Sequence, residues 1–320
     1  SQSQNMTSLS VSYNNSWHGV SYSLSYSMNK NTHDSDEDGN EVTNDNQFSL
    51  SVSVPLDRWM HNTWATYNLN NTKDGTTQNI GLNGTALKED NLNWNIQEGL
   101  SSTGSGNSTS INADYKATYG EVSAGVSQDK YQQTLNVGLQ GGVVAHANGV
   151  TLSQPLGETI ALVKAPGTHG THITNQTGVE TDFRGYTVVP FVTAYRHNTI
   201  ALDTETLPED ADVTHAAQIV TPTRGAVVRA SFTTRVGNRV LMTLTQNGKP
   251  LPFGATVTTG DKDSEFIVGN DGQTYLSGLP QQGHLNVSWG KEASEHCVAD
   301  YALTDEKEKT SIINAAAQCH

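Results

Sequence analysis

Residues 19–30, GVSYSLSYSMNK, alternate without a break between serine and a larger, mostly apolar side chain. Successive side chains of a β-strand point to opposite faces of the sheet. An extended chain therefore places Val20, Tyr22 and Leu24 on one face and the serines on the other. The same period of two recurs in NQFSLSVSVPL, residues 46–56. Both segments are predicted to be strands with one apolar and one polar face.

Segments of this kind fill the chain up to about residue 150, and we count about nine, each about ten residues long. Polar stretches such as NKNTHDSDEDGNEVTNDN, residues 29–46, separate them and are expected to be loops. One apolar residue from each segment is Val11, Leu24, Leu50, Tyr67, Leu82, Trp94, Ile111, Ala124 and Val137.

Two architectures fit this pattern. One is a soluble antiparallel sandwich or solenoid with one dry face. The other is the wall of a transmembrane β-barrel, whose apolar face meets lipid and whose polar face lines water. The almost wholly polar second face and the aromatic residues near segment ends, among them Tyr13, Trp17, Trp59 and Trp64, favour the barrel. Bacterial barrels have an even number of strands, and the pattern is already under way at residue 1, so we expect upstream strands to be missing.

The overall composition excludes some classes of function. Eighteen basic residues stand against 32 acidic ones, giving a net charge of −14, which excludes a positively charged nucleic-acid surface. Only 34% of the residues are hydrophobic, as expected of strands with a single apolar face. No window reaches the ~18 apolar residues of a membrane-spanning helix. The length suits about two or three domains.

The serine alternation stops after the small-residue stretch AHANG, residues 145–149, which we expect to act as a hinge where the wall ends. Beyond it lie short apolar strands and turn signals, with Asn247-Gly248 and Asp271-Gly272 predicted to form hairpins. This pattern is typical of β-sandwiches. The predicted fold is all-β: a partial barrel wall at 1–150 and two small sandwiches at 151–237 and 238–320.

Cys297 and Cys319 are the only cysteines. They either form a structural disulfide, which would close a loop of ~20 residues and stabilise the fold by roughly 3 kcal/mol, or are two thiols that never meet. We favour the disulfide, because no CxxC or Cys-His metal spacing accompanies the pair. A disulfide points to an oxidising compartment.

Catalytic and cofactor motifs are not found in the sequence. There is no HExxH, no GxSxG and no GxxxxGK[ST], so neither an enzyme nor a nucleotide-binding protein is predicted, and no cofactor is expected. His169 and His172 could bind a metal weakly, but we expect them to be solvated loop residues, and no metal site is predicted.

Two loops contain weaker candidates for partner binding. In DFRGY, residues 182–186, a turn with Phe183 and Tyr186 packed is favoured over Arg184 offering its donors to a partner or to the barrel rim. In GKPLPFGATV, residues 248–257, Phe253 is expected to fill a core, and partner contact is the alternative. Leu279 and Leu285 are interpreted as exposed apolar residues near a strand edge.

Several stretches of the second half resemble the C-terminal part of fimbrial outer-membrane ushers of the chaperone-usher pathway. They are GGVVAHANGVTLSQPLGETIALVKAPG (141–167), NQTGVETDFRGYTVVPFVTAYRHNTIALDTETLPEDADV (175–213), VTPTRGAVVRASF (220–232), NGKPLPFGATV (247–257) and GNDGQTYLSGLP (269–280). The resemblance is continuous from about residue 141 to 319, and the serine-rich strands before it fit the family's barrel.

The resemblance implies a non-enzymatic outer-membrane protein that helps assemble and secrete fimbriae. Its partners would be periplasmic chaperone–subunit complexes, pilus subunits and outer-membrane lipid, and its C-terminal sandwiches would lie in the periplasm. It also implies that the signal, the N-terminal domain, the plug and much of the barrel are absent from this chain. The alternative from a different class is a secreted or surface adhesin-like β-sandwich protein, whose serine-rich strands should stay soluble without detergent.

Overall fold

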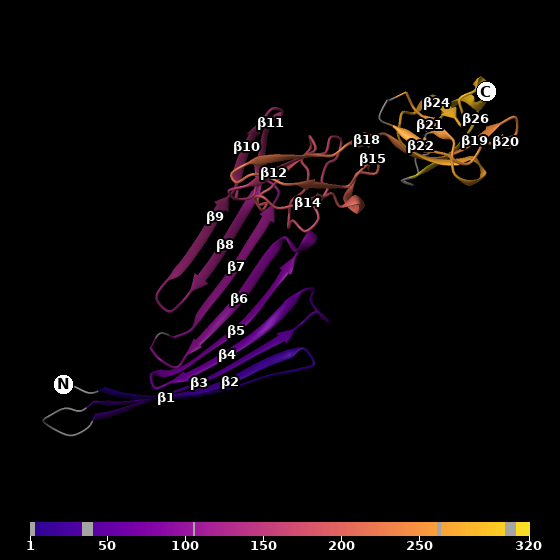
Figure 1. Ribbon diagram of the computed structural model, residues 1–320. Helices are drawn as coiled ribbons and strands as arrows, with labels where there is room; N and C mark the ends of the chain where they lie inside the picture. The colour runs from indigo at the N-terminus through magenta and orange to yellow at the C-terminus, as the bar shows by residue number, and fades with distance from the viewer. Residues whose placement is uncertain (1–3, 34–40, 105, 261–263, 305–311) are drawn as a thin grey trace. The chain divides into compact units, whose positions relative to one another are not determined.

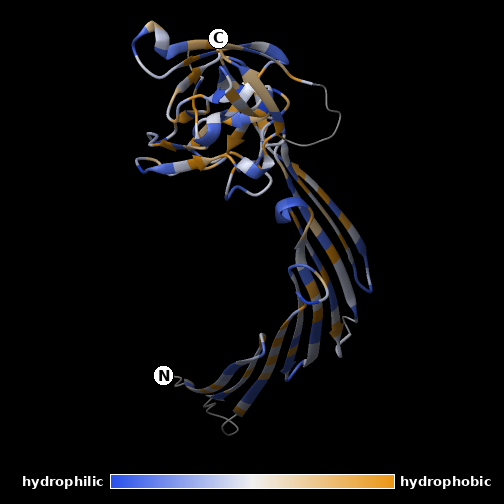
Figure 2. Ribbon diagram, turned by 90° about the vertical axis from the view of Figure 1, so that its right-hand side faces the viewer, coloured by the Kyte–Doolittle hydropathy of each residue, from blue (hydrophilic) through white to orange (hydrophobic). Residues whose placement is uncertain are grey.

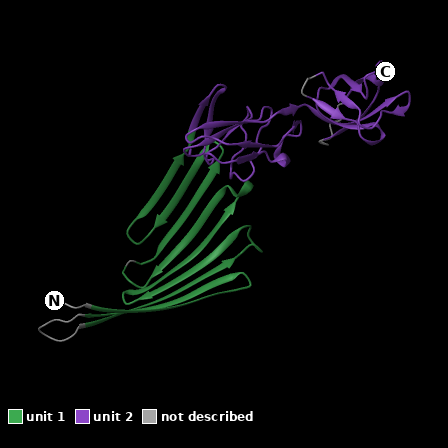
Figure 3. Cartoon of the chain, in the orientation of Figure 1, with its two compact units in different colours: residues 1–142 green, residues 143–320 purple. Residues whose placement is uncertain are grey.

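The computed structural model describes residues 4–33, 41–104, 106–260, 264–304 and 312–320, and these residues form an all-β chain (Figure 1). The chain divides into two compact units, residues 1–142 and 143–320 (Figure 3). No helix among the described residues is long and apolar enough to cross a membrane.

The first unit is one antiparallel sheet in which each of nine described strands pairs with the next along the chain. Its strands are β1 (Gln4–Trp17), β2 (Val20–His33), β3 (Glu41–Pro55), β4 (Thr63–Thr72), β5 (Gly75–Ala86), β6 (Leu92–Ser101), β7 (Ser108–Ala117), β8 (Gly120–Gln128) and β9 (Gln133–Gln140). The sheet is strongly curved, and hydrophobic and hydrophilic residues alternate along its strands (Figure 2).

The nine apolar segments predicted from the sequence coincide with these nine strands, so the all-β fold with a partial barrel wall is confirmed. The loop expected at residues 29–46 is shorter than predicted, because β2 continues to His33 and β3 begins at Glu41. The rest of that stretch, residues 34–40, lies outside the described residues. The polar ends of β2 and β3 pair with each other, from Asn29 opposite Asp45 to His33 opposite Glu41, although nearly all of their residues on both faces are polar.

The second unit begins with a hairpin of β10 (Gly142–His146) and β11 (Gly149–Ser153). The expected hinge at residues 145–149 is therefore wrong, because these residues form the end of β10, a two-residue turn and the start of β11. Gly149 suits the turn because its φ is +124°, and a Cβ there would lie 2.7 Å from the guanidinium of Arg184.

Three small sheets follow the hairpin. They contain β12 (Ile160–Lys164), β13 (Tyr186–Val189), β14 (Asn198–Ala201), β15 (Ala211–Val213), β16 (Ala217–Val220), β17 (Val227–Ser231) and β18 (Thr234–Val236), in the orders β13-β12-β17, β14-β16 and β15-β18. Strand β12 is buried on both faces. Ala161 and Val163 join one hydrophobic cluster, while Ile160 and Leu162 join a second one that includes Val144 of the hairpin.

Two four-stranded sheets enclose one further hydrophobic core in the remaining residues. Their orders are β20-β19-β23, with β26 also pairing β19, and β22-β21-β24-β25. The bounds are β19 (Asn238–Gln246), β20 (Lys249–Pro250), β21 (Thr256–Thr258), β22 (Glu265–Ile267), β23 (Gln273–Leu279), β24 (Gln282–Ser288), β25 (His296–Ala302) and β26 (Ile313–Gln318). Burial alternates along β25, as a strand with one face on a core requires.

The two predicted hairpin turns have different outcomes. Asn247 and Gly248 both have positive φ and join β19 to β20, so this hairpin is confirmed. Asp271 and Gly272 also have positive φ, but they join β22 to β23, which lie in different sheets. The hairpin predicted at Asp271-Gly272 is therefore wrong, because turn residues set the local bend and not the sheet in which the next strand pairs.

Candidate interaction sites

Much of the apolar face of the first unit is exposed along its described strands. Leu9, Ile80, Ile111, Leu135 and Val137 lie on this face and are at least half exposed. All three hydrophobic core clusters of the described residues lie between Val144 and Cys319, so none belongs to this sheet. A strand pattern with a bare apolar face and a polar opposite face is that of a membrane barrel wall, where lipid covers the apolar side.

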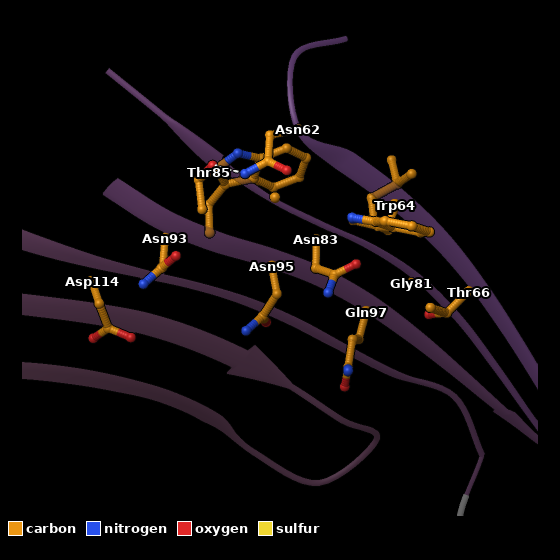
Figure 4. Close-up of a pocket in the computed structure, with 13 residues that line it drawn as sticks. Asn62, Trp64, Thr66, Gly81, Asn83, Thr85, Asn93, Asn95, Gln97 and Asp114 are labelled. Carbon is orange, nitrogen blue, oxygen red and sulfur yellow. Dashed lines mark hydrogen bonds between the residues drawn. The ribbon is translucent and has the colours of Figure 1, made fainter. Parts of the chain in front are cut away.

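The polar face of the sheet contains a pocket of about 480 Å³ near the ends of β4, β5 and β6 (Figure 4). Its polar lining comes from Asn62, Thr66, Asn83, Thr85, Asn93, Asn95, Gln97 and Asp114. Trp64, Leu82 and Trp94 also line it, and Trp64 is 39% exposed. The register pairs Trp64 with Asn83, and Asn83 with Asn95, so these three side chains share the polar face.

This pocket is not among the sites predicted from the sequence, where Trp64 is interpreted as an aromatic residue at the end of a strand. The sequence already indicated the face on which Trp64 lies. Along β4, Trp64 has the same parity as Thr66 and Asn68, whereas Ala65, Tyr67 and Leu69 form the apolar face. The strand partners of Trp64 could not be derived from the pattern, because the pairing register depends on the turns between strands.

The DFRGY segment forms a turn. The Asp182 carboxylate accepts hydrogen bonds from the backbone N–H groups of Arg184 and Tyr186 at 2.8 and 2.9 Å, and Gly185 has a φ of +84°. Tyr186 is buried as expected. The expectation that Phe183 packs is wrong, since its side chain is 79% exposed.

Both terminal nitrogens of Arg184 are engaged within the chain, whereas its buried Nε has no hydrogen-bond partner in the part of the chain that the structure describes. Its guanidinium donates to the carbonyl oxygens of Asn148 and Val150 at 3.1 and 2.5 Å, and lies 3.5 Å from the Asp182 carboxylate. The side chain thereby holds the β10–β11 hairpin against the turn at Asp182. Arg184 and Tyr186 remain candidates for partner contact, but in this structure their contacts stabilise the second unit.

His146 of β10 lies over this turn. Its ring stacks on Tyr186 with 4.8 Å between centroids, and Nε2 is 2.8 Å from the hydroxyl of Thr151. Nδ1 accepts from the backbone N–H of Asn148 at 3.3 Å, an arrangement that requires the neutral ring. Burial, and then the positive charges of Arg184 and Arg229, hold the pKa of His146 below its ordinary value.

The second unit is expected to lose stability on acidification because of His146. A lowered pKa means that the unfolded chain binds this proton more readily than the folded one, so the stabilisation is complete above about pH 6.5. It is lost as the pH falls through the lower folded pKa. The check is the unfolding temperature of residues 143–320 between pH 7.5 and 5, in the parent and in His146→Gln. The substitution should reduce the pH dependence, and an identical profile in both would contradict this role.

Three apolar candidates lie differently from what the sequence suggests. Phe253 is 76% exposed in the loop after β20, so the expected core role is wrong and partner contact remains. Leu279 and Leu285 are fully buried in the last core, so their expected exposure is wrong and neither can touch a partner in this conformation. A bulge explains Leu279: β23 advances three residues between Leu276 and Leu279 where β19 advances two, and both leucines turn inward.

Cys297 and Cys319 form a disulfide with Cα atoms 5.5 Å apart. It joins β25 to the residue that follows β26. The bond thereby connects the two four-stranded sheets that begin at Asn238, here called the last domain. His169 is exposed as expected, but His172 is buried, with Nδ1 3.1 Å from the carbonyl oxygen of Val179. No group of three His, Cys, Asp or Glu among the described residues could hold a metal ion.

The structure defines an all-β chain with a barrel wall followed by small β-domains, and comparison with known proteins identifies its family. The outer membrane usher protein family model matches residues 1–232, and the PapC C-terminal domain model matches residues 241–305. The chain therefore belongs to the outer membrane usher family. This membership places it in the bacterial outer membrane.

Individual relatives agree with this assignment. The chain is 47% identical over 280 residues to the outer membrane usher protein LpfC of Salmonella typhimurium, covering 86% of this chain and 33% of the relative. It is 44% identical over 287 residues to the outer membrane usher protein FimD of Escherichia coli K12, with the same coverage. The chain thus spans about a third of the length of these relatives.

One solved structure shares the fold along the whole chain. It is the cryo-EM structure of the E. coli P pilus tip assembly intermediate PapC-PapD-PapK-PapG, with a TM-score of 0.61 and 23% sequence identity. The match covers 100% of this chain and 38% of that one. At this identity the likeness supports the fold alone.

Proposed function

We propose that this chain is the C-terminal part of a non-enzymatic outer-membrane usher that binds chaperone–pilus subunit complexes and supports fimbria assembly and secretion. The observation that carries the proposal is the combination, in one usher-family chain, of a barrel wall with a bare apolar face and separately cored β-domains. In the solved relative, PapC occurs in a pilus tip assembly intermediate with PapD, PapK and PapG.

The parts of the chain receive separate roles in this proposal. Residues 1–150 contribute strands to the membrane pore, while residues 151–237 and 238–320 form two periplasmic domains that hold the complexes during assembly. Phe253 is a candidate contact because a largely exposed aromatic residue on a loop is available to a partner. Subunit transfer needs no nucleotide or cofactor in this scheme.

Binding of residues 143–320, produced in oxidised form, to purified chaperone–subunit complexes tests the proposal. We expect saturable binding to the complexes and none to the chaperone alone. We expect Phe253→Ala to weaken this binding more than Phe183→Ala, which removes a similarly exposed aromatic ring from another loop. If the folded, disulfide-bonded fragment binds none of several fimbrial complexes, the assembly role is contradicted.

A further inference from the structure

Trp64 stands out on the polar face of the wall, because its neighbours in this register along β4 are Thr66 and Asn68. Within the described part of β1–β9, the residues that share the face of the serines are small, amide, hydroxyl or charged, apart from Met6, His33, Pro55 and Trp64. Lipid contact cannot explain Trp64, because the lipid-facing set of β4 is Ala65, Tyr67 and Leu69. A half-exposed indole on a water-facing wall is a contact surface that the barrel itself does not need.

An asparagine row starts beside Trp64 and crosses the sheet. It consists of Asn83, Asn95, Asn112 and Asn136, in β5, β6, β7 and β9, with Gly125 completing the register in β8. Neighbouring strands lie about 4.8 Å apart, so the row from β4 to β9 extends over about 24 Å. Asn112 donates to Asn95 at 3.1 Å, which aligns two members of the row.

The row lies along two pockets. The first, of about 480 Å³, is lined by Trp64 and by Gly81, where a Cβ would lie 2.8 Å from the hydroxyl of Thr66. The second, of about 430 Å³, is lined by Asn112, Asn136 and Gly125. Asn95 and Asp114 line both, and Asp114 is the only charged residue in either lining.

Several polar groups in the pockets are available to a ligand. Among the described residues, no side-chain hydrogen bond engages Asn83, Asn93 or Gln97, although each faces the first pocket (Figure 4). An amide offers two donors and an acceptor in one plane, which suits the adjacent hydroxyls of a sugar ring. The C–H face of the same ring packs on an indole, and nearly neutral walls favour an uncharged ligand.

An extended polypeptide fits this face less well. Strand recognition relies on main-chain hydrogen bonds to a free sheet edge. Strands β5, β6, β7 and β8 are each paired on both sides, so their main-chain groups are already used. What this face offers to a ligand is an array of polar side chains, most of them amides, beside Trp64.

We propose that the asparagine row and Trp64 form a binding site for a neutral oligosaccharide on the polar face of the wall. One sugar ring stacks on Trp64 in the first pocket, and the following rings lie across Asn95 and Asn112 toward Asn136. This site is independent of subunit binding by the C-terminal domains.

The test is titration of the full chain with maltohexaose and, separately, with chitohexaose, in a detergent without a sugar headgroup, followed by calorimetry. We expect saturable binding of at least one with a Kd of about 1 mM or tighter. Trp64→Ala should weaken that binding by about tenfold, and Asn95→Ala by a smaller factor. Trp17→Ala is the matched control, because Trp17 lies on the apolar face, is 67% exposed and should leave the Kd unchanged.

Circular dichroism of each variant establishes that the sheet is intact before its Kd is compared. Absence of saturable binding for both saccharides overturns the proposal. So does binding that Trp64→Ala and Trp17→Ala affect equally. A polar hexapeptide is titrated in parallel, and if it binds through Trp64 while the saccharides do not, the site belongs to a polypeptide instead.

Discussion

Replacement of Leu24 by arginine is expected to destabilise the membrane-inserted wall by up to about 4 kcal/mol, because a cationic side chain on the lipid face costs about 2–4 kcal/mol at the bilayer midplane and less toward the interfaces. Leu24 lies in β2 opposite Tyr13 of β1 and Leu50 of β3, within a continuous apolar surface. Lipid cannot solvate the guanidinium, so the strand must shift or draw water into the bilayer. The measurement is urea unfolding of the full chain in lipid vesicles.

Ser25→Arg is the matched control for this substitution. Ser25 adjoins Leu24 but faces the polar side, opposite Ser12 and Ser49. An arginine there can reach water, so its effect should be small. Equal losses in the two variants would mean that the two faces do not differ in their surroundings. No loss in either would mean that the apolar face does not contact lipid, and the soluble adhesin-like alternative would regain support.

The period of two in the first unit made its strands predictable because nothing there competes with the alternation. Each strand has one face toward lipid and one toward water, so local sequence and local environment agree. The loop expected at residues 29–46 shows the limit of this reasoning, since polar side chains on both faces do not prevent strand pairing near the rim.

Burial in the second unit was harder to predict because it depends on distant partners. Strand β12 is apolar at Ile160, Ala161, Leu162 and Val163 because its two faces meet different clusters, one of which includes Val144 of the preceding hairpin. Leu279 is buried through a bulge that shifts its register against β19. Neither relationship can be derived from the residues around these positions alone.

The candidate sites divide in the same way. The DFRGY turn was predictable because its hydrogen bonds to Asp182 are local. The engagement of Arg184 with Asn148 and Val150 was not, because it spans more than thirty residues. The asparagine row is likewise visible only when the registers of β5 to β9 are known, although each member occupies the polar position that alternation assigns to it.

Replacement of Cys297 by serine is expected to lower the stability of the last domain by about 3 kcal/mol under oxidising conditions. The disulfide closes a loop with a sequence separation of 22, which restricts the unfolded chain and so raises its free energy. For a domain of this size each kcal/mol shifts the unfolding temperature by about 4–8 °C, so a decrease of roughly 12–24 °C should follow. Calorimetry of residues 143–320 measures it.

The reducing condition separates the covalent bond from the packing around it. Both cysteines belong to a buried core, so the serine also places a hydroxyl among apolar side chains. In reductant the parent loses the cross-link but keeps both thiols, and its remaining advantage over Cys297→Ser measures packing alone. The disulfide contribution is the additional difference seen only in oxidant. If the parent unfolds at the same temperature with and without reductant, although its thiols are shown to be reduced, the cross-link does not stabilise this domain.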